Sequence, residues 1–181
     1  MSVPSRIVAR GAAAGGARVR TLRAVRGWTL EQAAEAGNLD WRQIQRLEAG
    51  KLNPTLGTLA RLADGFGLCL GELVAEPTHR AYRVEVQRVE GYALRDTMRP
   101  APTPTPPVPA KPDEVCRALG QRVQTLRKAR GWTQNDLASR ADLALQHLQR
   151  VEQGRQNATT KVLVRIANAL GVGVADLFVP A

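Results

Sequence analysis

The sequence predicts an all-α protein made of two tandem five-helix modules joined by a partly ordered, proline-rich linker. The first observation is an internal repeat: a shift of 104 positions aligns RVRTLRAVRGWT, from Arg18, with RVQTLRKARGWT, from Arg122. The alignment continues without a gap to Val74 and Phe178, and 22 of its 57 positions are identical. The second observation is that apolar residues in both copies recur at helical spacing. A repeat of this length is a whole small domain, so the chain contains two copies of one fold.

Five short helices are predicted in the first copy, and several have their own start signal. Thr29 is expected to cap the second helix, because Gln32 three positions later completes a capping-box pattern. A turn at 37–38 separates it from the third helix, which Asp40 is expected to cap. The predicted helices of this copy are 16–26, 29–36, 40–49, 56–66 and 68–74.

The second copy repeats this plan. Asp113 is expected to cap a longer first helix through Ala129, and Thr133 the second helix. The third helix starts at Ala144 where the first copy has Asp40, so its start is less well capped by ~1 kcal/mol. The remaining predicted helices are 144–153, 160–170 and 174–178.

The domain boundaries follow from composition. The predicted order is a flexible basic arm over 1–15, a first domain over 16–75, a linker over 76–112 and a second domain over 113–181. Apolar and polar residues alternate over 82–87, which is typical of a strand. A lone strand is unstable, so this one packs on a module, pairs with its copy in another chain through 80–94, or does not form. Residues 100–112 are expected to form a semi-rigid proline-rich spacer that holds the two modules apart.

The composition narrows the function. The net charge is +10, which suits a surface that meets a polyanion. The two cysteines have no CxxC spacing, the two histidines stand alone, and no glycine-rich phosphate loop follows a strand. We therefore expect no metal, no cofactor, no small-molecule ligand and no enzymatic activity. No segment is long and apolar enough to span a membrane, so the predicted location is cytoplasmic and nucleoid-associated.

The third helix of each copy has an outward face suited to reading bases. On a helical wheel the outward residues are Arg42, Gln45, Arg46 and Ala49 in the first copy, and Gln146, Gln149, Arg150 and Gln153 in the second. Arginine pairs with guanine and glutamine with adenine in the major groove. Neither face contains an acid, unlike most solvated helix faces, so base reading is the favoured interpretation.

The combined motif LR-x-x-RGWT, a two-helix unit ending in R-[LV]-E-x-G, and the terminal G-[LV]-x-[LV]-x-[ED]-L resembles the phage-repressor and Cro type, the XRE-like family of helix-turn-helix proteins. The resemblance covers both copies. It implies a lambda-repressor-like five-helix bundle whose third helix enters the major groove, commonly in dimers. It also implies ion pairs of Arg23 with Glu48 and of Arg127 with Glu152, which orient the recognition helix.

The resemblance implies contacts with double-stranded DNA by position. Together with the wheel, it gives the predicted base contacts Trp41, Arg42, Gln45, Arg46, Leu145, Gln146, Gln149 and Arg150. The predicted phosphate contacts are Thr29, Lys51, Asn53, Gln134, Arg155 and Asn157. Leu30 departs from the family's glutamine at the position of Gln134. Three roles are open for Trp41: stacking on a thymine methyl group, covering the edge of the core, or contacting a protein partner.

Two functions remain open from the sequence. The first is a sequence-specific transcriptional regulator whose recognition helices, 40–49 and 144–153, read unlike half-sites, one containing G and one richer in A. A connector of roughly 40 residues could reach about 130 Å, which would leave the spacing of the half-sites open. The alternative is a protein-interaction adapter, or an antitoxin-like partner protein, in which only the second domain binds DNA.

Overall fold

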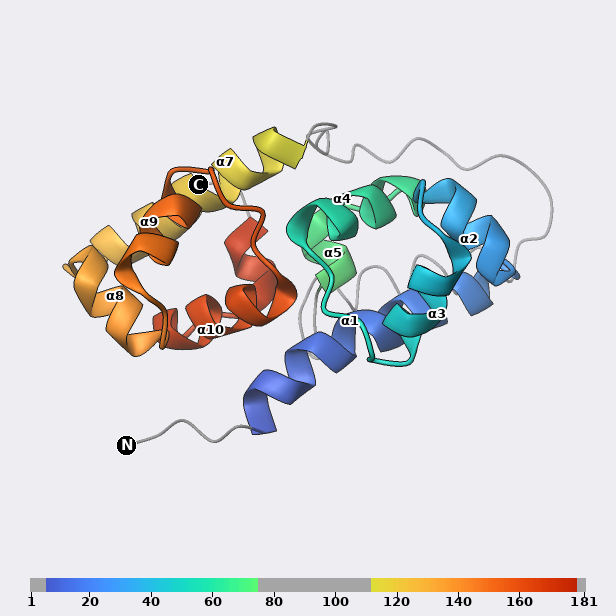
Figure 1. Ribbon diagram of the computed structural model, residues 1–181, viewed down its shortest axis with the longest axis horizontal. Coiled ribbons are helices and arrows are strands. Elements are labelled where there is room, and N and C mark those ends of the chain that lie inside the picture. The colour runs from blue at the N-terminus through green and yellow to red at the C-terminus, as the bar shows by residue number, and fades with distance from the viewer. Residues whose placement is uncertain (1–5, 75–111, 179–181) are drawn as a thin grey trace.

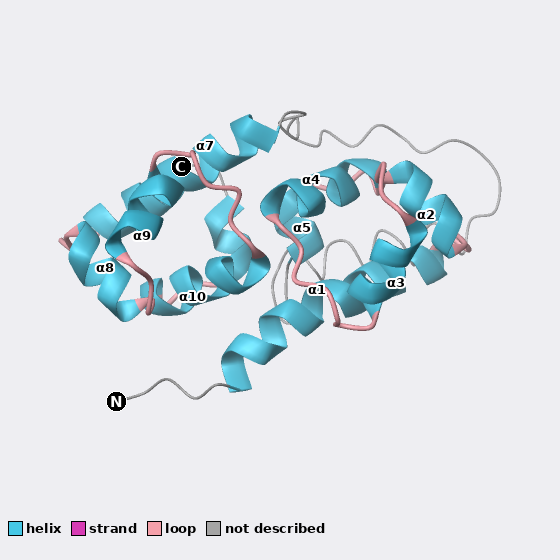
Figure 2. Ribbon diagram, in the orientation of Figure 1, coloured by secondary structure: helices cyan, strands magenta, loops and turns pink. Residues whose placement is uncertain are grey.

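The computed structural model of the chain describes residues 6–74 and 112–178, and every regular element in them is a helix (Figure 2). Module 1 consists of α1 (Arg6–Val25), α2 (Leu30–Ala36), α3 (Trp41–Glu48), α4 (Leu56–Gly65) and α5 (Leu70–Val74). Module 2 consists of α7 (Pro112–Lys128), α8 (Gln134–Arg140), α9 (Leu145–Glu152), α10 (Thr160–Leu170) and the 3-10 helix η1 (Val174–Phe178). The predicted all-α class and the two five-helix modules are confirmed.

The start of the first helix differs from the prediction. α1 begins at Arg6, although the sequence predicted a flexible arm over 1–15. The alanines of this segment favour helix strongly enough to outweigh its glycines. The predicted strand over 82–87, the pairing segment 80–94 and the spacer over 100–112, apart from Pro112 itself, lie outside the described residues.

The predicted caps of α2 and α3 are present. The Thr29 hydroxyl accepts a hydrogen bond from the Gln32 N–H at 3.2 Å, and the Thr29 N–H donates to the Gln32 side chain at 2.8 Å. Asp40 accepts from the N–H of Arg42 at 2.8 Å. By contrast, α9 has no side-chain cap at Ala144, and the weaker start of this helix stays a prediction.

The first two helices of module 2 have different residues at their N-termini. α7 starts at Pro112, so Asp113 lies inside the first turn and does not cap it; an acid there still favours the positive end of the helix dipole. Thr133 caps α8 as predicted, and its N–H and hydroxyl both donate to Asp136. These hydrogen bonds hold the pKa of the Asp136 carboxyl below its usual range.

The two modules share one apolar core. Buried side chains of module 1, such as Leu22, Ile44 and Leu62, belong to the same contiguous cluster as Leu119 and Leu148 of module 2. α5 packs on η1, α4 on α7, and α1 on α10, so the contacts between modules come from both ends of each repeat. The modules are therefore parts of one packed structure and are not held apart by the connector, contrary to the sequence-based expectation.

The arrangement has a pseudo-twofold axis. Figure 1 views the molecule nearly along it: a half turn in the plane exchanges α1 with α7, α3 with α9, and α4 with α10. Thr55 and Thr159, which are equivalent positions of the repeat, form an isolated antiparallel bridge with each other. Since each residue pairs with its own repeat mate, the axis passes between them.

Two close helix crossings depend on glycine. A Cβ on Gly16 of α1 would lie 2.1 Å from the backbone oxygen of Leu47, and a Cβ on Gly120 of α7 would lie 2.5 Å from that of Glu152. Both distances are far shorter than any real contact of a Cβ atom. The first helix of each module can therefore cross the C-terminal end of the third helix only where the side chain is a hydrogen.

We expect Gly16→Ala to destabilise the protein by ~1–3 kcal/mol, because α1 or α3 must move to admit the methyl group. The adjacent Gly15 is the matched control, since a Cβ there meets nothing within 4 Å. Gly15→Ala should stabilise the protein by ~0.5–1 kcal/mol through helix propensity. Urea denaturation of the two variants measures the difference; equal effects at the two positions would contradict the crossing.

Candidate nucleic-acid interface

The third helix of each module presents the predicted polar face to solvent. In α3 the side chains of Ile44 and Leu47 are buried, whereas Arg42 and Arg46 are exposed. α9 repeats the pattern: Leu148 and Val151 are buried, and Gln146 and Arg150 are exposed. No other described helix covers these four polar side chains. The pseudo-twofold relation places the two faces at equivalent positions of the two modules.

An ion pair fixes α3 to α1. The Arg23 guanidinium donates from Nε to Glu48 Oε1 at 2.7 Å and from Nη2 to Oε2 at 2.9 Å. Its Nη1 donates to the carbonyl of Trp28 at 2.9 Å. The hydrogen bond to Glu48 raises the pKa of Arg23 above its ordinary value. The pair predicted from the resemblance is confirmed, and it ties the C-terminal turn of α3 to two neighbouring segments.

The equivalent pair in module 2 is more deeply buried. Arg127 donates to the two carboxylate oxygens of Glu152 at 2.6 and 3.0 Å and to the carbonyl of Trp132 at 2.7 Å. The Arg127 and Glu152 side chains are 8% and 1% exposed, compared with 20% and 9% for the pair in module 1. The hydrogen bond to Glu152 raises the pKa of Arg127.

In module 2, hydrogen bonds connect the ion pair to the outward face of α9. Module 1 has no equivalent connection to α3. Gln134, at the start of α8, donates to Glu152 Oε2 at 2.8 Å and accepts from the Gln149 side chain at 3.4 Å. The equivalent of Gln134 in module 1 is Leu30, which has no side-chain amide. Gln149 is therefore oriented by a chain of hydrogen bonds, whereas Gln45 in α3 has no matching residue to orient it.

The tryptophan at the start of α3 makes a cation–π contact with the arginine that follows it. Trp41 is 38% exposed, and the Arg42 guanidinium lies over its ring at 5.2 Å from the centroid. Leu145, at the equivalent position of α9, is also 38% exposed. Each recognition helix thus begins with a large apolar side chain that remains accessible, which leaves it able to contact a thymine methyl group.

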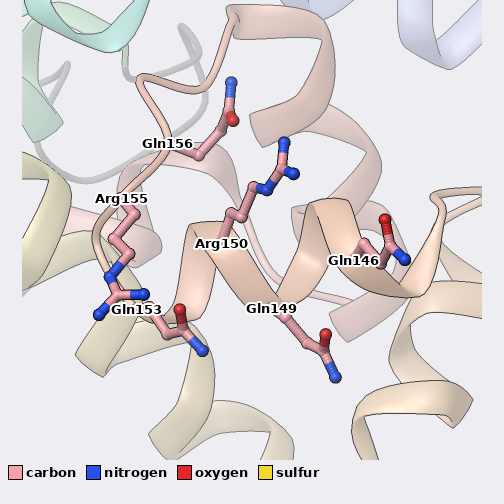
Figure 3. A pocket seen from close by; sticks show the side chains of 6 residues that line it. All are labelled: Gln146, Gln149, Arg150, Gln153, Arg155 and Gln156. Carbon is pink, nitrogen blue, oxygen red and sulfur yellow. The ribbon is translucent and has the colours of Figure 1, made fainter.

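A polar hollow of about 490 Å³ lies along α9 and the loop after it (Figure 3). Figure 3 shows its six lining side chains projecting from the ribbon: Gln146, Gln149, Arg150, Gln153, Arg155 and Gln156. All are amides or guanidinium groups, which donate hydrogen bonds to base edges and phosphates. Gln156 was not predicted from the sequence, although the polar run Gln153 to Asn157 that contains it was a signal.

The predicted phosphate contacts fall into two groups. Lys51 and Arg155 are exposed in the loops after α3 and α9, and Thr29 lies exposed at the start of α2. Asn53, Asn157 and Gln134 already make hydrogen bonds to other groups of the protein, although Asn157 is exposed: the two asparagines accept from backbone N–H groups of the opposite module, and Gln134 donates to Glu152. For these three residues, contact with a phosphate remains a prediction. The side-chain amide nitrogen is the only atom of each that could donate a hydrogen bond to it.

Within residues 6–74 and 112–178, no group of histidine, cysteine and acidic side chains could hold a metal ion. None of the helices in that part of the chain is both long and apolar enough to cross a bilayer. The two cysteines are free thiols, and burial raises the pKa of Cys69 to about 11.

Comparison with known proteins agrees with this geometry. Family models match both modules: one described as "Helix-turn-helix" over residues 123–177 and one described as "Helix-turn-helix domain" over residues 16–76. An uncharacterized HTH-type transcriptional regulator of Sinorhizobium fredii is 34% identical over 67 residues, which cover 37% of this chain and 87% of that protein. The chain therefore belongs to the helix-turn-helix regulators, and within them to the phage-repressor, XRE-like type.

Two repressors are also similar. The immunity repressor protein of Bacillus phage phi105 is 39% identical over 59 residues, covering 33% of this chain and 41% of the repressor. The competence pilus inhibition repressor of Acinetobacter baylyi is 32% identical over 63 residues, covering 35% of this chain and 57% of that protein. This chain spans about half the length of these two relatives. No solved structure matches it.

Proposed function

We propose that the protein is a sequence-specific regulator of transcription that binds double-stranded DNA with α3 and α9 in the major groove. The observation that carries the proposal is the exposure of Arg42, Arg46, Gln146 and Arg150 on two helices anchored from behind by ion pairs. A helix of this width fits the major groove, and anchored guanidinium and amide groups suit bidentate contacts with bases. The similarity to regulators and repressors supports the same function.

The two faces support unlike half-sites. α3 offers Arg42 and Arg46, which pair best with guanine, and Trp41, which packs on a methyl group. α9 offers Gln146 and an oriented Gln149, which pair best with adenine. Selection of bound duplexes from a random pool should therefore return a site with one G-containing half and one half richer in A. A perfect palindrome would contradict this assignment.

Salt dependence is the direct test of DNA recognition. We expect affinity for the selected duplex to fall about 100-fold between 50 and 200 mM salt, the loss for roughly four neutralised phosphates. Fluorescence anisotropy at a series of salt concentrations measures the slope, and a scrambled duplex gives the non-specific baseline. Affinity that does not change with salt, or no preference over the scrambled duplex, would refute the proposal.

A further inference from the structure

The two modules complete each other's backbone hydrogen bonds. The N–H of Leu56, the first residue of α4, donates to the carbonyl of Ala158 at 2.7 Å. The N–H of Thr160, the first residue of α10, donates to the carbonyl of Pro54 at 2.9 Å. Each of these bonds is the repeat mate of the other. All four residues are buried, so water cannot replace the partner module without opening the interface.

A second reciprocal pair comes from side chains. The N–H of Gly57 donates to the Asn157 side chain at 3.0 Å, and the N–H of Lys161 donates to the Asn53 side chain at 3.2 Å. Asn53 and Asn157 are identical in the two copies and lie at equivalent positions. The first N–H groups of a helix have no partner within it. In this protein the loop of the opposite module supplies partners for the first two of those N–H groups in α4 and in α10 alike.

The interface is also closely packed around the axis. α5 faces η1, and Gly71 lies so close that a Cβ on it would be 3.5 Å from the carbonyl oxygen of Ala175 and 3.8 Å from the Cβ of Phe178. Gly71 and Ala175 are again equivalent positions. A methyl group fits this space in ordinary contact, whereas a larger side chain would force the modules apart.

We infer that one chain reads a complete operator of a single fixed geometry: two unlike half-sites in inverted orientation, at one centre-to-centre spacing. The inference rests on the proposed function. A twofold relation between recognition helices requires inverted half-sites, just as a symmetric dimer requires a palindrome. Because the interface fixes the two helices relative to each other, the spacing is set by packing and not by the length of the connector.

The alternative is two modules tethered by a free connector, and it makes a different prediction. A flexible tether tolerates any spacing it can span and does not distinguish inverted from direct half-sites. A rigid pair engages both half-sites only when they lie on the same face of the duplex and at the distance that separates α3 from α9. Moving one half-site by five base pairs turns it to the opposite face, because five base pairs are about half a helical turn.

The test uses the full chain and four duplexes built from the selected half-sites. They carry the selected inverted arrangement, the same arrangement with five base pairs inserted, the same with ten inserted, and a direct repeat. We expect the selected duplex to bind at least ~100-fold more tightly than the other three, because only one module engages each of those. Native mass spectrometry should show one chain per selected duplex.

Variants at Gly71 test whether the interface sets the spacing. Gly71→Phe should reduce the preference for the selected duplex over the five-base-pair insertion from about 100-fold to a few-fold, because separated modules become tethered ones. Gly71→Ala is the matched control and should keep the preference, since its methyl group fits. Far-ultraviolet circular dichroism confirms that both variants remain helical.

The outcomes separate the two proposals. Equal, specific binding to all four duplexes by the natural chain would overturn the fixed geometry and leave the proposed function standing. Two chains on the selected duplex would also overturn it, since the partner module would then come from another molecule. If no sequence is recovered from the pool, the proposed function fails, and this inference fails with it.

Discussion

Replacing Arg150 by alanine is expected to weaken binding to the operator about 10- to 100-fold and to relax the preference at one or two positions of the A-richer half. Arg150 is exposed on α9 within the polar hollow, and a bidentate contact with a base contributes ~1–3 kcal/mol of discrimination. Gln146→Ala should act on the same half. Anisotropy titrations against the operator and its single-base variants measure both effects.

Arg140→Ala is the matched control for charge. It removes the same formal charge from module 2, but its guanidinium lies over the Trp132 ring at 4.4 Å and not on the outward face of α9. It should weaken all duplexes by a few-fold at most, without altering base preference. Losses of similar size for the Arg140 and Arg150 variants would show that charge alone, and not base reading, accounts for the affinity.

Arg42→Ala with Arg46→Ala makes the corresponding change on α3. The expected result is a similar loss confined to the G-containing half. Unchanged binding after this double substitution, with binding abolished by the changes in α9, would instead mean that only module 2 meets DNA and that module 1 serves another partner.

The second large effect is expected at Glu152. The Arg127 side chain is 8% exposed in the natural protein; replacing Glu152 by alanine removes its carboxylate partner and leaves it the contact with the Trp132 carbonyl. An unpaired buried charge costs ~3–5 kcal/mol. Because the modules share one core, we expect both modules to unfold together at a lower urea concentration. We also expect a lower affinity for the operator, because α9 loses the ion pair that anchors it.

Glu48→Ala provides the comparison within the same chain. Arg23 is 20% exposed, so water can solvate it once the carboxylate is gone, and the expected cost is ~1–3 kcal/mol. Replacing Arg127 and Glu152 together by methionine and leucine should recover most of the stability lost in Glu152→Ala. The burial argument would be wrong if the Glu48 and Glu152 variants lost equal stability.

Much of each module could be predicted because its signals are local. The caps at Thr29 and Asp40, the periodic apolar residues and the repeat itself each depend on a few neighbouring positions. The helical segment 6–15 was missed because its two glycines, Gly11 and Gly15, suggested irregular chain. α1 also packs on α10, a contact between the modules that no local pattern reveals.

The candidate site divides in the same way. The outward faces of α3 and α9 follow from helical periodicity, and the two ion pairs follow from the family resemblance. Asn53 and Asn157 show the limit: their position in the loop suggested a role at the phosphate backbone, but their side-chain oxygens bind the opposite module. These bonds join residues 100 and 108 positions apart across an interface that the sequence did not predict, so they could be found only from the structure.

The joining of both modules in one polypeptide changes how occupancy of a target site would depend on the concentration of the protein. A repressor that must first find a second copy occupies its target with roughly the square of its concentration at low levels, so its response has a threshold. Here the paired state exists before any encounter between molecules. If one chain reads a whole operator, as proposed, its occupancy at low levels rises in proportion to the number of chains, and no second copy is required.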